Sequence, residues 1–395
     1  MKPERPEGEP REPGAATQAV FAGSITRVPG GPVVTPVYQT ATFFSEAAPE
    51  GEPRYTRYAN NPNHELLARR LAALEGAEAS LVLASGNAAA ALTLLTLCGA
   101  GDHVVAAREL YGGTLRLLTR DLPRLAIETT FVPLGGDWAA AVRPNTRVLW
   151  LELPVNPTLR IPDIRPVADL AVRRGIALVV DATFATPINF RPLAWGASIA
   201  LHSATKYLGG HSDLTAGVVS GRAALVEEIR QKLISFGPVL DPHAVWLLER
   251  GVKTLAVRMA VHNDNALRVA TRLAEHPAVL AVHYPGLACH PDHDLARELL
   301  AGFGGMVSLV VRGGDEAALR VVNRLRLLCV APSLGGVESL VSMPRFTSHS
   351  ALTPAERHAL GIADGFIRIS IGIEDPADLV ADLEQALVPE VSAGT

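Results

Sequence analysis

Short apolar segments alternate with stretches of helical periodicity through the middle of this chain, and this alternation constrains the fold more than any other feature. The apolar runs read SLVLA, HVVAA, RVLWLEL, IALVVD, SIALHS and AGVVS. Runs that are apolar throughout are typical of strands buried on both faces, and helices between them indicate parallel connections. The sequence therefore predicts an α/β fold with a mostly parallel sheet in three layers.

The segments on either side of this pattern have a different character. Residues 1–16 are polar and proline-rich, which predicts a disordered tail. Residues 17–62 contain many Pro, Gly and Thr and little helical periodicity, which predicts an extended arm. Helical spacing starts in HELLARRLAALEGA, so we assign residues 63–250 to a large domain. Residues 251–395 contain a long helical pattern, strands near MVSLVV and FIRISIG and a final helix, and we assign them to a smaller α+β domain.

Composition excludes several classes of protein. Of 395 residues, 48% are hydrophobic and 19% are charged, and the net charge is −4. Without a basic stripe, nucleic acid is not an expected partner. The N-terminus lacks the apolar core of a secretory signal, and no apolar run reaches the roughly 20 residues that a bilayer requires, so no membrane association is expected.

Cysteine and histidine positions give no sign of a disulfide framework or a metal centre. The three cysteines, Cys98, Cys289 and Cys329, are far apart and odd in number, which favours a reducing, cytoplasmic setting. The segment CHPDHD, starting at Cys289, lacks regular ligand spacing. We therefore predict no metal site.

Polar residues gather where four of the predicted strands end. These exits are SGN (85–87), ELPVNP (152–157), DATFATP (181–187) and HSATK (202–206). Ligands of open α/β sheets bind beyond the carboxyl ends of the strands. All four exits are therefore expected to face one crevice.

Lysine is rare in this chain, which narrows the search for a nucleophilic amine. Only Lys2, Lys206, Lys232 and Lys253 occur among 36 basic residues. The guanidinium of arginine stays protonated in proteins, so amine chemistry needs one of these four. Lys206 follows the apolar run ASIALHSAT, where burial would lower its pKa and favour the neutral amine that condenses with an aldehyde. The alternative is a surface lysine that follows a strand.

The neighbours of Lys206 favour the first interpretation. Ser203 and Thr205 offer hydroxyl donors beside it. The predicted strand, the turn at 85–87 and the helix after it would point backbone N–H groups at one spot, as phosphate sites do. Together these signals indicate a phosphorylated aldehyde as the ligand.

Two further charged residues have a chemical interpretation. Asp181 ends the most hydrophobic strand, IALVVD, and would need a partner such as a protonated pyridine nitrogen. A helix-capping role is the alternative. Arg368 lies in the alternating strand FIRIS, where its fork-shaped cation could bind a carboxylate. Its alternative is a solvent-facing position.

These motifs resemble those of the Cys/Met-metabolism family of pyridoxal-phosphate (PLP) enzymes, which includes cystathionine γ-synthase, cystathionine γ-lyase and methionine γ-lyase. The most specific is HSATKYLGGHSD, and YTRYANNP, LYGGT, ELPVNPT, DATFATP, SLGGVESL and FIRISIGIED support it. The likeness runs from about Thr17 to Leu387. It implies the aspartate-aminotransferase-like fold of PLP fold type I, a PLP cofactor and small amino-acid substrates. It also implies a homo-oligomer, by the habit of the family a tetramer, whose subunits share active sites.

The resemblance also implies roles for single residues. The catalytic positions are Lys206 as the cofactor-bearing lysine, Asp181 as the partner of the pyridine nitrogen and Tyr111 as the ring stacked on the cofactor. Further cofactor-binding positions are Gly86, Asn87, Thr183, Ser203 and Thr205, together with Tyr55 and Arg57, which reach the phosphate of a neighbouring subunit. The substrate-binding positions are Asn156, Ser333, Arg368 and Arg116.

A few positions depart from patterns common in the family. Gly113 stands where methionine γ-lyases tend to have cysteine, and Pro332 where many γ-lyases and bacterial synthases have glutamate. Asn87 replaces an apolar residue and Ala182 a frequent asparagine. The segment APSLGGVES is similar to plant-type cystathionine γ-synthases.

We therefore expect a γ-replacement enzyme that exchanges the activated oxygen of a homoserine ester for a thiol such as cysteine. The alternative is γ-elimination, as in a cystathionine or methionine γ-lyase, giving a 2-oxoacid, ammonia and a thiol. A non-catalytic scaffold is a third alternative, against which the intact Lys206, Asp181, Tyr111 and Arg368 argue. Protein that stays colourless after addition of the cofactor would favour the scaffold.

Overall fold

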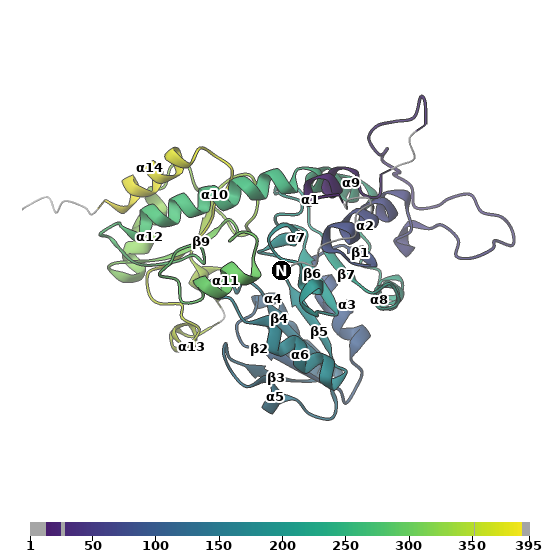
Figure 1. Ribbon diagram of the computed structural model, residues 1–395, viewed down its shortest axis with the longest axis horizontal. Helices are drawn as coiled ribbons and strands as arrows, with labels where there is room; N and C mark the ends of the chain where they lie inside the picture. The colour runs from purple at the N-terminus through teal and green to yellow at the C-terminus, as the bar shows by residue number, and fades with distance from the viewer. Residues whose placement is uncertain (1–12, 25–27, 351, 389–395) are drawn as a thin grey trace, which may run out of the picture.

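The computed structural model describes residues 13–24, 28–350 and 352–388. Its centre is a seven-stranded sheet (Figure 1). In spatial order the strands are β1 (Ala79–Leu83), β7 (Gly217–Gly221), β6 (Ile199–Ser203), β5 (Ala177–Asp181), β4 (Thr146–Glu152), β2 (His103–Ala107) and β3 (Glu128–Val132). Among these strands β7 runs antiparallel to its neighbours β1 and β6, and the other pairs are parallel. The expected α/β fold with a mostly parallel sheet is confirmed.

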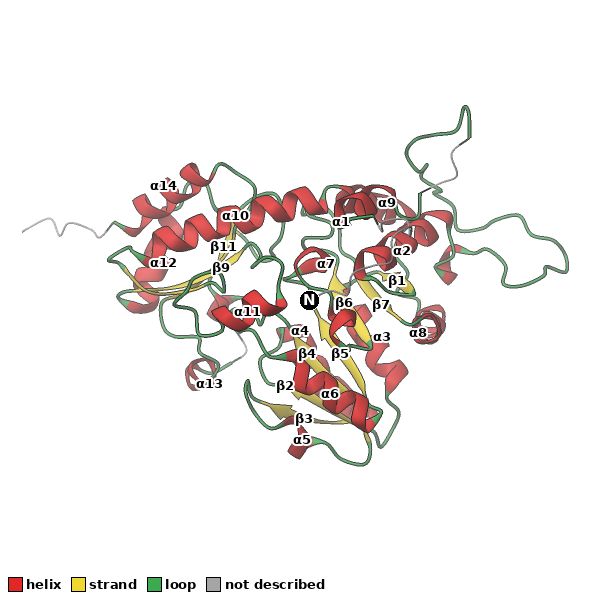
Figure 2. Ribbon diagram, viewed as in Figure 1, coloured by secondary structure: helices red, strands yellow, loops and turns green. Residues whose placement is uncertain are grey.

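Helices cover both faces of this sheet (Figure 2). Side chains of β1 alternate between the faces: Leu81 and Leu83 pack in one buried cluster with α3 and α8, and Val82 packs in another with α2 and α9. The helices of this domain are α2 (Pro62–Glu75), α3 (Gly86–Leu97), α4 (Gly112–Arg116), α5 (Trp138–Ala141), α6 (Ile164–Arg174), α7 (Thr186–Asn189), α8 (Ala223–Phe236) and α9 (Pro242–Lys253). Because successive side chains of β1 point to opposite faces of the sheet, they pack against the helices on both sides.

A second, five-stranded sheet follows in the chain and has its own core. Its strands, in spatial order, are β10 (Cys329–Val330), β11 (Leu340–Ser342), β12 (Phe366–Ser370), β9 (Met306–Val311) and β8 (Val279–His283). Its helices are α12 (Gly314–Arg324), α13 (Pro354–Ala359) and α14 (Pro376–Leu387). Helix α11 (His293–Leu299) comes before β9 in the chain, but its Ala296 and Leu299 pack in the core of the large sheet. The fold therefore contains two packed units, each around one sheet.

Helix α10 (Leu255–Ala274) connects the two units. Figure 1 shows it running from beside α1 and α9 to beside α14. Its buried residues join different cores, since Met259 packs with the large sheet and Val269 with the small one. One rigid element thus sets how the two sheets lie relative to each other.

The start of the chain differs from the expectation of a tail to residue 16 and an extended arm from residue 17. Residues 1–12 lie outside the described residues, and Ala15–Phe21 form helix α1. Ala19 is fully buried against the cluster that contains α2, α9 and α10. A seven-residue helix is too short for periodicity to reveal it. From residue 28 to Tyr55 the segment contains no helix, and parts of it project from the body, with Val33 and Phe44 almost fully exposed (Figure 1). Thr35, between these parts, is buried and its carbonyl accepts from Trp246 Nε1 over 2.9 Å.

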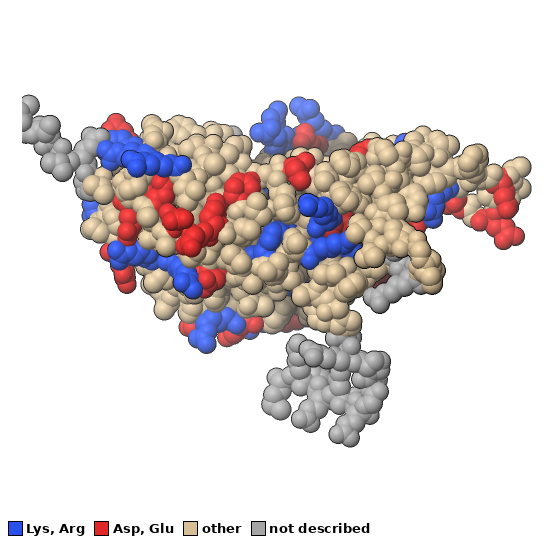
Figure 3. All heavy atoms as spheres, turned by 90° about the horizontal axis from the view of Figure 1, so that it is seen from above, with Lys and Arg blue, Asp and Glu red and all other residues tan. Residues whose placement is uncertain are grey.

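The surface is mixed in charge on the face that Figure 3 shows, where acidic and basic side chains are interspersed with uncharged surface. Among the described helices, none is both long and apolar enough to cross a membrane.

Candidate active site

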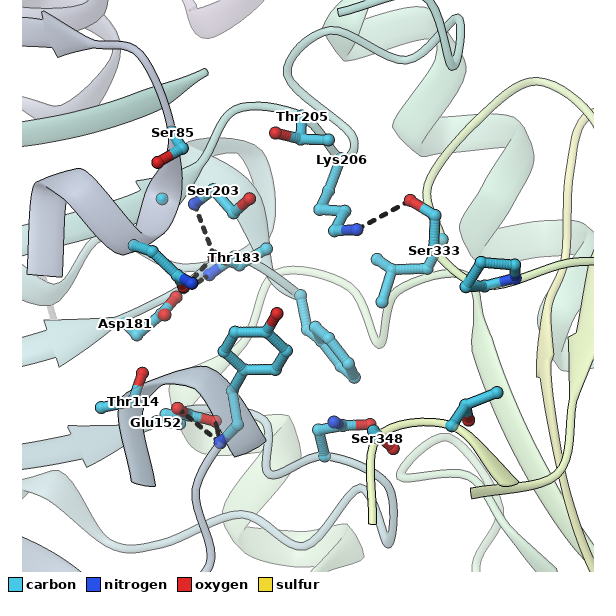
Figure 4. A pocket seen from close by; sticks show the side chains of 18 of the residues that line it. Ser85, Thr114, Glu152, Asp181, Thr183, Ser203, Thr205, Lys206, Ser333 and Ser348 are labelled. Atoms are coloured by element: carbon cyan, nitrogen blue, oxygen red, sulfur yellow. Dashed lines mark hydrogen bonds between the residues drawn. The ribbon is translucent and has the colours of Figure 1, made fainter. Parts of the chain in front are cut away.

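A cavity of about 710 Å³ opens at the carboxyl ends of the central parallel strands. The last residues of three neighbouring strands, Glu152, Asp181 and Ser203, all line it. The small domain contributes Ser333 and Arg368 to the opposite wall. Figure 4 shows how the labelled side chains of both domains face this space. The predicted convergence of strand exits on one crevice therefore matches the geometry.

Lys206 reaches the cavity from the turn that follows β6. Its Nζ donates a hydrogen bond of 2.7 Å to Ser333 Oγ (Figure 4). Burial, aided by the positive charge of Arg368, lowers the pKa of Lys206 to about 8. Near neutral pH a useful fraction of this amine is therefore unprotonated and nucleophilic.

Thr183 ties the ends of β5 and β6 together. Its hydroxyl donates to Asp181 Oδ1 over 2.5 Å, its N–H donates to the same oxygen over 3.0 Å, and its Oγ1 accepts from Ser203 N over 2.8 Å. Burial raises the pKa of Asp181, and the two hydrogen bonds from Thr183 oppose that rise. The carboxylate of Asp181 is thus held in one orientation at the cavity wall.

Glu152 is a site residue that sequence reasoning did not single out. It lies beside Asp181 in the strand register, and its two carboxyl oxygens accept from Tyr111 N over 2.8 and 2.9 Å. Burial, with the charge of Asp181, raises the pKa of Glu152 well above its ordinary value. Two buried carboxyl groups this close favour one proton between them.

The buried Arg368 is placed to bind an anion. Its Nη1 donates to Asn156 Oδ1 over 3.0 Å and its Nη2 donates to the Ser333 carbonyl over 3.1 Å. Only 6% of Arg368 is exposed, so the solvent-facing alternative is wrong. It sits in the middle of β12, where the neighbouring β9 places Ser308 opposite it. Arg368, Asn156 and Ser333 therefore form one polar group across the domain boundary.

Most of the predicted site residues line the same cavity. They are Lys206, Tyr111, Asp181, Gly86, Asn87, Thr183, Ser203, Thr205, Asn156, Ser333 and Arg368. The hydroxyl of Thr205 is engaged with the backbone of Ala216, accepting from its N–H over 3.0 Å. Further lining residues that sequence reasoning missed include Thr114, Phe184 and Ser348. Thr114 ends the motif LYGGT and could have been found there, but Ser348 belongs to none of the quoted motifs.

Three predicted residues lie elsewhere in the described chain. Tyr55 and Arg57 do not line the cavity of their own chain, and Arg57 Nη1 donates to the Ile234 carbonyl over 2.7 Å. Arg116 lines an adjoining hollow of about 610 Å³, which shares Asn87 and Tyr111 with the cavity. The two spaces are thus neighbours.

Within the described residues, no group of three or more His, Cys, Asp or Glu side chains could hold a metal ion. In the segment CHPDHD, Asp292 instead accepts hydrogen bonds of 2.5 and 3.0 Å from Arg160.

Comparison with known proteins points to one family. Residues 16–388 match the family described as Cys/Met metabolism PLP-dependent enzyme. The chain is 44% identical to L-methionine gamma-lyase of Pseudomonas putida, over 96% of this chain and 98% of that protein. It is 45% identical to cystathionine gamma-lyase of Bacillus subtilis, over 90% of this chain and 94% of that protein. The crystal structure of metB from Corynebacterium glutamicum aligns with a TM-score of 0.89 at 40% identity, over 95% and 98% of the two chains.

The fold and these matches define a PLP-dependent enzyme of fold type I. The chain belongs to the Cys/Met-metabolism family of PLP-dependent enzymes, whose members named above act on sulfur amino acids. The resemblance noted in the sequence, the fold class and the cofactor are thereby confirmed.

The residues of the cavity fit pyridoxal phosphate. A Cβ atom at Gly86 would lie 2.8 Å from Ser203 Cβ and 2.9 Å from its Oγ, so the start of α3 approaches the end of β6 as only glycine allows. The backbone N–H groups at that helix start suit a phosphate. Asp181 can accept from a protonated pyridine nitrogen, and Lys206 supplies a neutral amine for the aldehyde.

Proposed function

We propose that this enzyme catalyses γ-replacement, in which an O-activated homoserine exchanges its oxygen substituent for a thiol such as cysteine. The observation that carries the proposal is the position of the Lys206 amine, which bonds Ser333 beside the carboxylate-binding Arg368. An amino acid whose carboxylate is held by Arg368 would present its α-carbon to that amine. A base can remove the α-proton only when it lies within hydrogen-bond reach of it, and the Lys206 amine would be that base.

Each residue has a role in this proposal. Bound pyridoxal phosphate supplies the electron sink for the α-carbon. Lys206 carries the cofactor and moves the α-proton and the protons on the γ side, while Asp181 bonds the pyridine nitrogen. Arg368 and Asn156 hold the carboxylate, and Tyr111 covers the ring. Four residues would bind the phosphate. They are Gly86 and Asn87 at the start of α3 and Ser203 and Thr205 at and after the end of β6.

Close packing around Gly113 and an adjoining hollow support replacement over dedicated cleavage of methionine. A Cβ atom at Gly113 would lie 2.4 Å from Tyr111 Cε1 and 2.8 Å from Asn87 Oδ1, so the cysteine that methionine γ-lyases tend to carry would require both side chains to shift. The adjoining hollow with Arg116 adds volume beside the cavity, which a second substrate requires. Pro332 gives the wall next to Ser333 an apolar surface.

The second candidate function is γ-elimination on cystathionine. It is favoured by the 45% identity to a protein named cystathionine gamma-lyase. The two functions differ in whether a thiol adds to the activated substrate or whether protonation and hydrolysis by water complete the reaction, and the same residues serve both.

Product analysis separates the two candidates. Purified enzyme is incubated with O-acylhomoserine with and without cysteine, and separately with cystathionine. We expect cystathionine to form only when cysteine is present and to form faster than it is cleaved. Cleavage of cystathionine that is far faster than its synthesis would make elimination the function.

We also infer that Tyr55 and Arg57 reach the phosphate of a neighbouring subunit and that the enzyme is a tetramer. The inference is supported by the exposed, projecting segment before Tyr55, and by the absence of both described side chains from the cavity of their own chain.

A further inference from the structure

Arg258, in the first turn of α10, is a buried cation without a carboxylate partner among the described residues. Only 4% of it is exposed, and its hydrogen bonds end on neutral oxygens. Nη1 donates to the Tyr207 carbonyl over 2.7 Å, Nη2 to the Gly251 carbonyl over 2.8 Å, and Nε to Thr254 Oγ1 over 3.0 Å. Burying an unpaired guanidinium is costly, so its position calls for a compensating role.

The guanidinium holds the turn that carries Lys206. Tyr207 directly follows that lysine, and Gly210 N donates to the Lys206 carbonyl over 2.8 Å. A Cβ atom at Gly210, which has φ +73°, would lie 2.1 Å from Arg258 Nη1. The guanidinium therefore occupies the space that a side chain at position 210 would need, and the turn closes directly onto it.

Helix α9 packs against the same turn. A Cβ atom at Gly251 would lie 2.2 Å from the Gly209 carbonyl oxygen, so the end of this helix meets the turn backbone to backbone. Arg258 bonds both partners, at Tyr207 and Gly251. It thus closes the contact between the lysine turn and the junction of α9 and α10.

One turn further along α10, His262 contacts the other side of the site. Its Nδ1 lies 2.7 Å from the carbonyl oxygen of Ile371, which directly follows the strand that carries Arg368. Its ring packs edge-on against the ring of Tyr207, with centroids 5.1 Å apart. Helix α10 therefore contacts both the segment that carries the amine and the segment that carries the carboxylate-binding cation.

We propose that Arg258 is a positioning residue that sets where the Lys206 amine lies relative to Arg368. The proposal rests on the role of Lys206 in the proposed function. Arg258 holds the carbonyl next to the lysine at a fixed place on α10, and α10 holds the strand of Arg368. Misplacement of a base by about 1 Å can cost on the order of 100-fold in rate.

The test uses the full enzyme loaded with pyridoxal phosphate and three variants in α10 and the residue before it. Arg258→Met removes all three donors, and Arg258→Lys keeps one cation that can still bond Tyr207. Thr254→Val removes the acceptor of Nε together with the hydroxyl that donates to the Gly251 carbonyl over 3.1 Å. The matched control is Arg268→Met, because Arg268 is an exposed residue of the same helix paired with Asp264 over 2.8 Å. Urea unfolding of each variant checks that it is folded.

We expect kcat of Arg258→Met to fall by about 100-fold while KM changes by less than about threefold, because the base and not the carboxylate site is displaced. Arg258→Lys should recover part of the loss, Thr254→Val should show a smaller loss, and Arg268→Met should match the parent. In cofactor-free protein, Arg258→Met should also form the borohydride-reducible bond with pyridoxal phosphate more slowly than the parent.

Two outcomes overturn the inference. One is a folded Arg258→Met with the kcat and bond-formation rate of the parent. The other, if Arg258→Met does not fold, is parent-like kcat in both Arg258→Lys and Thr254→Val. The proposed function itself fails if borohydride fixes no cofactor on Lys206 of the parent enzyme. Mass spectrometry of the Lys206 peptide detects that result.

Discussion

Lys206 differs from a surface lysine in its burial and in its lowered pKa, and both properties favour its reaction with an aldehyde. Its pKa lies near 8 instead of 10.5, chiefly because of burial and secondarily because of the charge of Arg368. In cofactor-free protein the folded chain therefore gives up this proton before the unfolded chain does. The folding penalty of the protonated amine is full below about pH 8 and disappears as the pH rises toward 10.5.

The rate at which cofactor-free protein takes up pyridoxal phosphate should follow this titration. We expect the rate to rise with pH and to level off above about pH 8, because only the neutral amine attacks the aldehyde. Arg368→Leu should move the midpoint upward, since it removes a nearby positive charge. The midpoint is measured by borohydride trapping across a pH series. An unchanged midpoint in that variant would mean that Arg368 does not act on the amine.

Gly86→Ala tests the close approach of α3 to β6. The added methyl group would meet Ser203 at 2.8 to 2.9 Å. Overpacking of this kind typically costs about 1–3 kcal/mol, so we expect cofactor affinity to fall by about tenfold or more. Gly99→Ala is the control, because the nearest atom to its Cβ would be Asp102 Oδ2 at 3.8 Å. Equal affinities in the two variants would remove the proposed role of Gly86.

At the residue scale, the sequence predicted what local pattern can show and missed what depends on register. Asp181 and Lys206 were found because each ends or follows an apolar run. Glu152 was missed because its importance comes from lying opposite Asp181, and the pairing of β4 with β5 is not written in either strand alone. The burial of Arg368 depends likewise on neighbours from β9 and β11.

At the element scale, the buried ion pair between α2 and α9 should carry much of the stability of this part of the fold. Arg70 Nη1 and Glu249 Oε1 are 3.1 Å apart, and both side chains are at most 2% exposed. Removing one partner of such a pair typically costs about 3–5 kcal/mol, because the other charge stays buried. We therefore expect Glu249→Leu to lower the free energy of unfolding by that amount, as measured by urea denaturation.

An exposed ion pair provides the control for that measurement. Arg54 and Glu65 are 3.1 Å apart, with side chains 40% and 37% exposed. Glu65→Ala should cost less than about 1 kcal/mol. If Glu249→Leu and Glu65→Ala lower the free energy of unfolding by similar amounts, the buried ion pair contributes no more to stability than the exposed one.

Elements of the large sheet could be predicted because their strands are largely apolar, and β2 and β7 are indeed buried throughout. Helix α1 could not, since seven residues hold under two full turns and only Ala19 is buried. The reversed direction of β7 was also beyond the sequence, because an apolar run does not indicate which way a strand points.

At the scale of the whole molecule, shared active sites can be tested by mixing inactive chains. Lys206→Ala removes the amine, and Arg57→Ala removes the side chain proposed to reach the neighbouring phosphate. In a hybrid of the two chains, one site would combine the intact Lys206 of one subunit with the intact Arg57 of the other. We expect activity to appear after the variants are dissociated and reassembled together, and cofactor to bind weakly to Arg57→Ala alone.

The control for this experiment is each variant dissociated and reassembled by itself, which should stay as inactive as before. If the mixed sample gains no activity although hybrids form, Arg57 serves the site of its own chain. Hybrid formation is measured by native mass spectrometry.

The cavity is walled by two separately packed sheets, with the groups assigned to the cofactor on one side and Pro332, Ser333 and Arg368 on the other. Mutations in the smaller unit can therefore reshape which amino acid is accepted while Asp181 keeps the hydrogen bonds that Thr183 donates to it. Evolution can thus change which metabolite the enzyme accepts through substitutions in one wall of the cavity, without rebuilding the other wall. Replacing residues 332–334 with those of a relative is the shortest exchange that would alter this wall of the cavity.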